Sequence, residues 1–79
     1  MKAKVFTSRT CGPCATYKRN LEGLSDVEFI DIDDPANIDQ AIAAGVMMVP
    51  TTVFPDGTTW TGVRSREEFQ GVFQGVFQV

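Results

Sequence analysis

Residues 2–17, KAKVFTSRTCGPCATY, decide the fold, because in them a strand pattern runs into two cysteines and then into a helical pattern. Residues 2–7 alternate polar with apolar side chains, which predicts a short β-strand. The loop that follows ends at Pro13, and proline fits the first turn of a helix. Apolar residues then recur at helical spacing over residues 14–24, which predicts an amphipathic helix. The segment therefore predicts a strand, a loop with two cysteines and a helix in direct succession.

A second strand and a second helix follow. Residues 27–32 are rich in apolar side chains and predict a strand parallel to the first, because a helix connects the two. Asp34 before Pro35 is typical of a helix start, and Gly45 is typical of a helix end. This half of the chain therefore predicts a β-α-β unit followed by a helix.

The remainder predicts a hairpin and a third helix. Residues 51–54 and 58–61 are β-prone and flank the turn sequence Pro-Asp-Gly, which predicts an antiparallel pair of strands. Ser65 and Glu68 have the spacing of a capping box at the start of the last helix. The full order is β-α-β-α-β-β-α, an α/β fold with a four-stranded mixed sheet flanked by three helices.

The last helix contains a small repeat, Phe-Gln-Gly-Val at residues 69–72 and again at 73–76. A period of four places its apolar residues on one stripe, made of Phe69, Val72, Phe73, Val76 and Phe77. We favour packing of this stripe on the sheet over an exposed patch for a partner, since such stripes are usually core. The glycines in the repeat weaken the helix, so fraying is expected near Val79.

Length and charge limit the possible functions. A chain of 79 residues with 43% hydrophobic content supports one core, so we expect a single domain over residues 1–79. The net charge is −3, and the longest basic cluster is the pair Lys18-Arg19, which disfavours nucleic acid as a partner. The first residues fit neither a signal peptide nor a membrane span. We expect a cytoplasmic monomer that does not bind membranes.

Cys11 and Cys14 are the candidate reactive residues. A disulfide between them would close too small a loop to stabilise the fold, which favours a redox pair. At the helix start, unsatisfied amides and the helix dipole favour a thiolate, so Cys11 is the expected nucleophile. Cys14, one turn into the helix, is expected to be more buried and to resolve the mixed disulfide. With no histidine and two cysteines, a single chain cannot complete a four-ligand zinc site.

The Cys-Gly-Pro-Cys sequence at residues 11–14 is that of the thioredoxin active site, and the element order resembles the glutaredoxin-like branch of the thioredoxin superfamily. Val49-Pro50-Thr51 is similar to the loop in which that superfamily places a cis-proline against the cysteines. The resemblance implies a cis Val49-Pro50 bond and backbone pairing of Val49 with an incoming polypeptide. The predicted substrate-binding residues are Val49, Pro50, Gly12, Pro13 and Arg9.

Within that branch the chain resembles the NrdH-redoxins, through residues 14–19 and through Trp-Thr-Gly-Val-Arg at 60–64, similar to their Trp-Ser-Gly-Phe-Arg signature. The resemblance implies a dithiol donor that binds no cofactor itself. It implies electrons from NADPH through a flavoprotein, thioredoxin reductase, and delivery to protein disulfides, with ribonucleotide reductase as the favoured substrate. The enzyme alternative is a glutathione-coupled glutaredoxin. An alternative of another class is a non-catalytic binding subunit or a cluster-bridged dimer.

Several single residues have two interpretations. Arg9 either stabilises the Cys11 thiolate and steers acidic partners, or is a solvated charge. Trp60 either contacts the substrate or closes the core, and the core interpretation is preferred. Arg64 is expected to organise its turn rather than to contact substrate. Met47 and Met48 form either an adaptable apolar contact for partner polypeptides or part of the core.

Three acidic residues, Asp31, Asp33 and Asp34, lie close together after the second strand. Such a cluster could hold a metal ion or act in acid-base chemistry. The simpler interpretation is preferred: Asp34 caps a helix, and the other two end a strand at the solvent.

Overall fold

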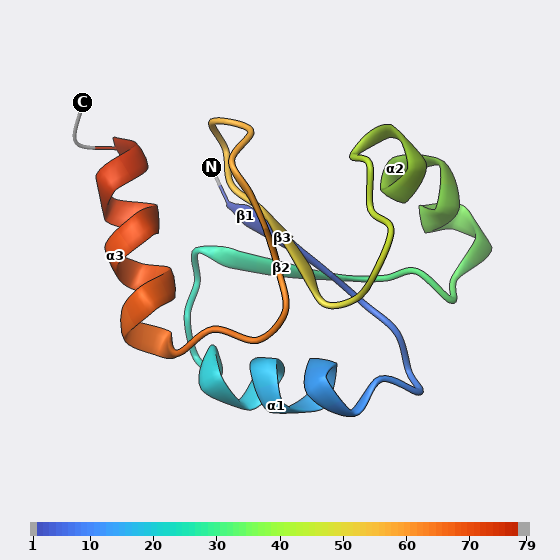
Figure 1. Cartoon of the computed structure of the whole chain (residues 1–79), viewed down its shortest axis with the longest axis horizontal. Helices are drawn as coiled ribbons and strands as arrows, with labels where there is room; N and C mark the ends of the chain where they lie inside the picture. Colours follow the sequence, from blue (N-terminus) through green and yellow to red (C-terminus); the bar gives the residue numbers. More distant parts are fainter. Residues whose placement is uncertain (1, 78–79) are drawn as a thin grey trace.

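The computed structural model describes residues 2–77 of the chain, and the side chains of residues 2–75. The elements, in order, are β1 (Ala3–Thr7), α1 (Gly12–Asn20), β2 (Val27–Asp31), the 3₁₀ turn η1 (Pro35–Asn37), α2 (Ile38–Ala43), β3 (Thr51–Val53), β4 (Thr59–Thr61) and α3 (Arg66–Phe77) (Figure 1). This order confirms the predicted β-α-β-α-β-β-α arrangement. In the described part of the chain, no helix has both the length and the apolar character that crossing a membrane requires.

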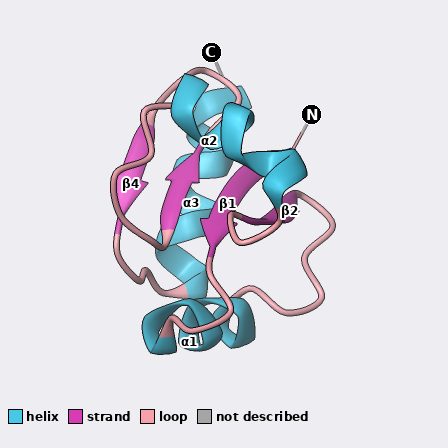
Figure 2. Cartoon of the chain, turned by 90° about the vertical axis from the view of Figure 1, so that its right-hand side faces the viewer, coloured by secondary structure: helices cyan, strands magenta, loops and turns pink. Residues whose placement is uncertain are grey.

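The four strands form one mixed sheet in the order β2-β1-β3-β4, with β4 and β2 at its two edges (Figure 2). β1 pairs with β2 in parallel, while the β1–β3 and β3–β4 pairs are antiparallel. In this register Val5 lies between Phe29 and Thr52, and Thr7 pairs with Asp31. The carboxyl ends of β1 and β2 therefore meet at the same edge of the sheet.

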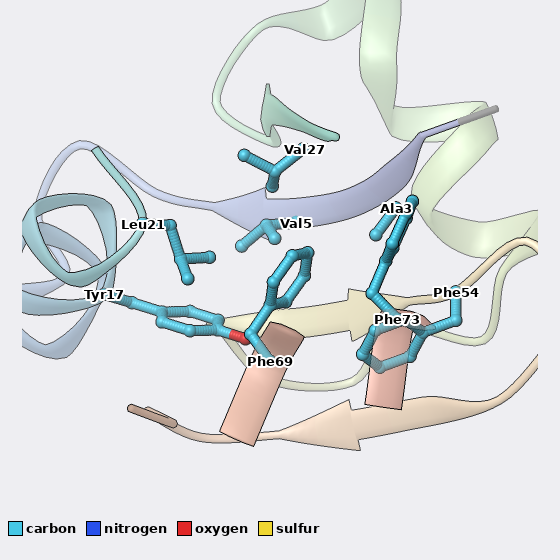
Figure 3. Close-up of a cluster of buried hydrophobic side chains, with 8 residues drawn as sticks. All are labelled: Ala3, Val5, Tyr17, Leu21, Val27, Phe54, Phe69 and Phe73. Carbon is cyan, nitrogen blue, oxygen red and sulfur yellow. The ribbon is translucent and has the colours of Figure 1, made fainter. Parts of the chain in front are cut away.

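The strands alternate their side chains between two faces, and each face buries its own cluster. One face packs against α1 and α3, and its buried residues are Ala3, Val5, Tyr17, Leu21, Val27, Phe54, Phe69 and Phe73 (Figure 3). The other face packs against α2 through Phe6, Ile30 and Ala41. Figure 1 shows α2 on the side of the strands away from α1 and α3. The sheet therefore separates α1 from α2.

Helix α1 begins earlier and ends earlier than the sequence pattern predicts. The predicted span was 14–24, whereas the helix covers Gly12–Asn20. After Asn20 the chain continues in turns, and Gly23 adopts a positive φ of 84°, which ends any helical path. Leu21 is still fully buried, so an apolar side chain at helical spacing reaches the core from a turn.

The caps of the later helices follow the predicted chemistry. The Asp34 carboxylate accepts from the Ala36 amide at 3.0 Å, which caps η1 directly before α2. At α3, the Glu68 amide donates to Ser65 Oγ at 3.1 Å and the Ser65 amide donates to Glu68 Oε1 at 3.3 Å. This reciprocal pair is the predicted capping box.

The repeat in α3 contributes to the core in its first half. Phe69 and Phe73 are buried, and Val72 packs partly against the same cluster. The packing interpretation of these three residues is therefore confirmed. The side chains of Val76 and Phe77, and the expected fraying near Val79, lie outside the described residues.

Candidate active site

The two cysteines form a disulfide at the start of α1, with their Cα atoms 5.2 Å apart. Cys11 is the N-cap, and its extended backbone (φ −91°, ψ 109°) turns the chain from the loop into the helix. The Cys14 amide donates to Cys11 Sγ at 3.1 Å, so sulfur takes the place that a hydroxyl or carboxylate oxygen usually has at an N-cap. Gly12 and Pro13, between the cysteines, are exposed.

The two sulfurs differ in exposure. Cys11 is partly exposed, whereas Cys14 is 1% exposed. After reduction, the Cys14 amide and the amino end of α1 face Cys11 Sγ and favour its thiolate form. Cys11 therefore lies toward the solvent with Cys14 behind it, and the division of roles, in which Cys11 attacks and Cys14 resolves, stays a prediction.

The second loop at the site joins α2 to β3, and we call residues 47–50 the methionine loop. The Val49-Pro50 bond is cis, as the sequence implied, and Pro50 is buried. The Val49 carbonyl oxygen lies 3.7 Å from Cys11 Sγ, within reach of the Cys11 thiol in the reduced protein. Two further hydrogen bonds fix the loop, from Thr51 Oγ1 to the Met48 carbonyl at 2.6 Å and from the Gly62 amide to the Pro50 carbonyl at 2.8 Å.

The loop between β1 and α1 is held on its other side by two carboxylates, and we call residues 8–10 the anchored loop. Asp33 Oδ2 accepts from Ser8 Oγ at 3.0 Å and from the Arg9 amide at 2.9 Å. Asp31 Oδ2 accepts from Arg9 Nε at 2.7 Å. Asp31 ends β2 and Asp33 is exposed, as predicted, and both carboxylates also bind the loop that leads to Cys11, a contact that the prediction did not include. The signal was available in the parallel pairing of β1 and β2, which brings their carboxyl ends together.

Arg9 is placed by Asp31 and not by the sulfurs. Its side chain is 71% exposed and forms an ion pair with Asp31 at 2.7 Å. The pKa of Asp31 lies below its ordinary value, first because the Asp33 amide donates to its carboxylate and then because Arg9 does. The structure thus brings together Cys11, Cys14 and Val49. Arg9 instead contacts Asp31 and Asp33, the carboxylates that hold the anchored loop.

A buried hydroxyl pair connects α1 to β3. The Tyr17 hydroxyl lies 2.9 Å from Thr52 Oγ1, and both residues are fully buried. Burial raises the pKa of Tyr17, although the hydrogen bond to Thr52 opposes the shift. The sequence pattern identified Tyr17 only as an apolar helix position, and it missed this polar contact between the two elements.

Trp60 and Arg64 lie where the last strand turns into α3. Trp60 meets the Phe54 ring edge-on at 5.0 Å and is partly buried against the larger cluster. The Arg64 guanidinium lies 4.9 Å from the Trp60 ring centroid, and the Arg64 carbonyl accepts from Asn20 Nδ2 at 3.0 Å. Both residues therefore serve the packing of this turn against the end of α1, in line with their expected structural roles.

Met47 and Met48 are exposed. Their exposed fractions are 96% and 58%, which removes the core interpretation and leaves that of a surface contact. They lie two residues and one residue before Val49, whose carbonyl oxygen is 3.7 Å from Cys11 Sγ.

Comparison with solved structures shows the fold. An uncharacterized thioredoxin-like protein from Clostridium perfringens superimposes with a TM-score of 0.74 at 21% identity, over 94% of this chain and 68% of that one. A thioredoxin from Malassezia sympodialis gives 0.69 at 26% identity, over 92% and 71% of the two chains. A thioredoxin from Thermus thermophilus gives 0.65 at 23%, over 96% and 72%. The chain has a thioredoxin-like fold.

A curated relative of the thioredoxin-like domain is much longer. NADPH-dependent thioredoxin reductase 3 from Arabidopsis thaliana is 35% identical over 75 residues, which cover 84% of this chain and 14% of the reductase. No family model matches the chain. The fold, together with the Cys11–Cys14 pair at the start of α1, gives the thioredoxin-like domain a thiol–disulfide oxidoreductase site.

Proposed function

We propose that the chain is a dithiol electron donor that reduces disulfides in proteins. The observation that carries the proposal is the unequal cysteine pair, with Cys11 accessible at the helix start and Cys14 1% exposed behind it. An accessible thiolate suits attack on a substrate, and a sheltered partner suits intramolecular resolution.

The reaction has two exchange steps. The Cys11 thiolate attacks one sulfur of the substrate disulfide, forming a mixed disulfide and releasing the other substrate sulfur as a thiolate. Cys14, as thiolate, then attacks Cys11 Sγ, which releases the second substrate sulfur and forms the Cys11–Cys14 disulfide found in the structure. Two electrons pass from the protein dithiol to the substrate. The Val49 carbonyl, 3.7 Å from Cys11 Sγ, supports pairing of the substrate backbone with this loop as an added strand.

The proposed source of electrons is NADPH, through a flavoprotein of the thioredoxin reductase kind, with no cofactor bound to this chain. Similarity to a segment of an NADPH-dependent thioredoxin reductase supports this source. The NrdH-redoxin likeness of residues 60–64 supports ribonucleotide reductase as the favoured substrate. We place the protein in the cytoplasm as a single-domain monomer.

The test is reduction of insulin disulfides with two electron sources in parallel. One reaction contains NADPH and thioredoxin reductase, and the other contains NADPH, glutathione and glutathione reductase. We expect activity with the first system and loss of turnover in Cys14→Ser, because the mixed disulfide at Cys11 can no longer be resolved. Ala15→Ser, which adds a serine at an exposed neighbouring position, is the matched control and should keep full activity.

The other outcomes identify the alternatives. Activity with glutathione alone, retained by Cys14→Ser, would indicate a monothiol glutaredoxin. Silence in both systems, with iron bound to the purified protein, would indicate the cluster-bridged dimer. For the downstream step, the reduced protein should sustain turnover by ribonucleotide reductase, and failure there with insulin reduction intact would assign a different substrate.

A further inference from the structure

Two exposed apolar side chains belong to the methionine loop, whose Val49 carbonyl lies near the reactive sulfur. Met47 is 96% exposed and Met48 is 58% exposed. They directly precede Val49, whose carbonyl oxygen is 3.7 Å from Cys11 Sγ. The chain has three methionines, and the third, Met1, is its first residue. Both accessible thioethers of the described chain therefore border the site where a substrate polypeptide would lie.

We propose that Met47 and Met48 form an oxidation site, at which peroxides convert the thioethers to sulfoxides and thereby weaken docking of disulfide-containing polypeptides beside Cys11. The inference rests on the proposed function. In each conversion the peroxide O–O bond breaks and an S–O bond forms. The methionine sulfur loses two electrons, and hydrogen peroxide is reduced to water.

The docking contact is sensitive to this change because of what methionine offers. An unbranched, polarisable thioether adapts to apolar side chains of different shapes, which suits a donor that meets varied substrate sequences. The occupant is the extended segment that flanks the substrate disulfide, since its backbone would run along Val49 and its side chains would reach Met47 and Met48. A sulfoxide presents a polar, chiral group to the same side chains and loses that contact.

The fold of the domain does not depend on either thioether being unmodified. Thr51 Oγ1 donates to the Met48 carbonyl and the Gly62 amide donates to the Pro50 carbonyl, so these hydrogen bonds of the methionine loop do not involve the methionine side chains. Met47, at 96% exposure, buries almost nothing within the chain. Oxidation should therefore change substrate docking while stability stays the same.

The cysteines and the methionines also differ in their reactivity toward peroxide and in how their oxidised forms are reduced. In the Cys11–Cys14 disulfide both sulfurs are already bonded, so peroxide acting on the oxidised protein meets the thioethers first. A thiol reductant restores the dithiol, whereas a sulfoxide requires its own reductase. Modification at the methionine loop consequently outlasts the redox cycle of the cysteines.

The experiment treats the disulfide form with hydrogen peroxide, removes the peroxide, and measures reduction of insulin with dithiothreitol as electron source. Tandem mass spectrometry establishes oxidation at Met47 and Met48. We expect kcat/KM toward insulin to fall about three- to tenfold, mostly through KM, because contacts of a methionine sulfur contribute at this level. Reduction of a small aromatic disulfide, which has no flanking polypeptide, and the Tm should stay unchanged.

Two double variants control the assignment. Met47→Leu/Met48→Leu removes both thioethers and keeps the apolar surface and Met1, so peroxide treatment should leave its insulin kcat/KM at that variant's own untreated value. Met47→Gln/Met48→Gln should show the lowered insulin activity without peroxide. Full insulin activity of the doubly oxidised protein, or equal loss in the leucine variant, overturns the inference alone. Absence of insulin reduction by the untreated protein overturns the proposed function and the inference together.

Discussion

The anchored loop and the methionine loop both border Cys11, but they are held differently. The anchored loop donates hydrogen bonds to carboxylate side chains of another segment, whereas the methionine loop accepts hydrogen bonds at its own main-chain carbonyls. Two carboxylates, Asp31 and Asp33, receive the hydrogen bonds of the anchored loop from Ser8 and Arg9. In the methionine loop, the accepting groups are main-chain carbonyls, and the methionine side chains are left to the solvent.

This difference suits the two tasks of the site. The anchored loop leads into Cys11, and the Ser8 carbonyl accepts from the Cys11 amide at 3.3 Å, so carboxylates that hold Ser8 also help to position the nucleophile. The methionine loop carries the exposed Met47 and Met48 and a Val49 carbonyl 3.7 Å from Cys11 Sγ. Under the proposed function, the anchored loop positions the nucleophile and the methionine loop contacts the substrate.

Thr51→Val is expected to have the largest effect on stability and insulin reduction, because it removes the side-chain hydroxyl that holds the methionine loop. Thr51 is 4% exposed and donates to the Met48 carbonyl at 2.6 Å. Loss of this hydrogen bond should lower the free energy of unfolding by about 1 kcal/mol, measured by urea denaturation. The Val49 carbonyl should then be less well placed, so kcat/KM for insulin should fall more than for a small aromatic disulfide.

Thr51→Ser is the matched control, because serine keeps the hydroxyl and loses only a methyl group. Its insulin activity should remain close to that of the wild type. If Thr51→Val left both stability and the insulin-to-small-disulfide ratio unchanged, the backbone anchoring of the methionine loop would not depend on this bond.

A smaller effect is expected from Asp33→Ala in the anchored loop. The change removes the acceptor of Ser8 Oγ at 3.0 Å and of the Arg9 amide at 2.9 Å. Because these groups are exposed, water replaces the carboxylate, and stability should fall less than in Thr51→Val. The alkylation rate of Cys11 in the reduced protein should change by less than about threefold, through looser positioning of the nucleophile.

Asp26→Ala supplies the control for charge, since Asp26 is an exposed acid that precedes β2 at its opposite end. It removes the same charge without touching the anchored loop and should leave alkylation unaltered. Equal changes in both variants would mean that net charge, and not the hydrogen bonds of Asp33, acts on Cys11.

Periodicity and motif chemistry predicted most of the fold. The alternation over residues 2–7 correctly predicted β1, but it did not assign Val5 and Phe6 to opposite faces of the sheet, where they enter different clusters. The end of α1 was misplaced, since Leu21 keeps helical spacing and burial even though the chain has already entered a turn. Apolar spacing reports which side chains face the core, and it does not report whether the backbone is still helical.

The site was predictable where chemistry is local and less so where it depends on register. Cys11 and Cys14 could be predicted as a redox pair from their spacing and from their position between a strand and a helix. The contacts of Asp33 with Ser8 and of Thr51 with the Met48 carbonyl join different segments or a specific turn. The partner of Asp33 follows only from the pairing of β1 with β2, which no single stretch of sequence contains. The Thr51 contact is local and depends on the conformation of the loop before β3.

The smallest effect concerns acid stability and the Arg9–Asp31 pair. The pKa of Asp31 is lowered below the ordinary aspartate value of 3.8, first by the Asp33 amide and then by Arg9. The folded chain therefore binds this proton less readily than the unfolded chain. The resulting stabilisation is complete above the unfolded pKa and is lost as the pH falls through the folded pKa. In Asp31→Asn, Tm should therefore decrease slightly less as the pH falls below about 5. The difference should be small because both partners of the ion pair are partly solvated.

Asp56→Asn is the informative comparison, because the Thr58 amide lowers the pKa of Asp56 in the β3–β4 turn, where no cation takes part. Both variants should flatten the acid limb of the Tm profile, since each removes a carboxylate that accepts a backbone amide. Only the effect of Asp31→Asn should shrink when sodium chloride is added, because an exposed ion pair is screened and a backbone hydrogen bond is not. Equal salt dependence in the two variants would mean that Arg9 contributes nothing measurable. The anchored loop would then be held by the backbone amides and Ser8, as the methionine loop is held by Thr51 and Gly62.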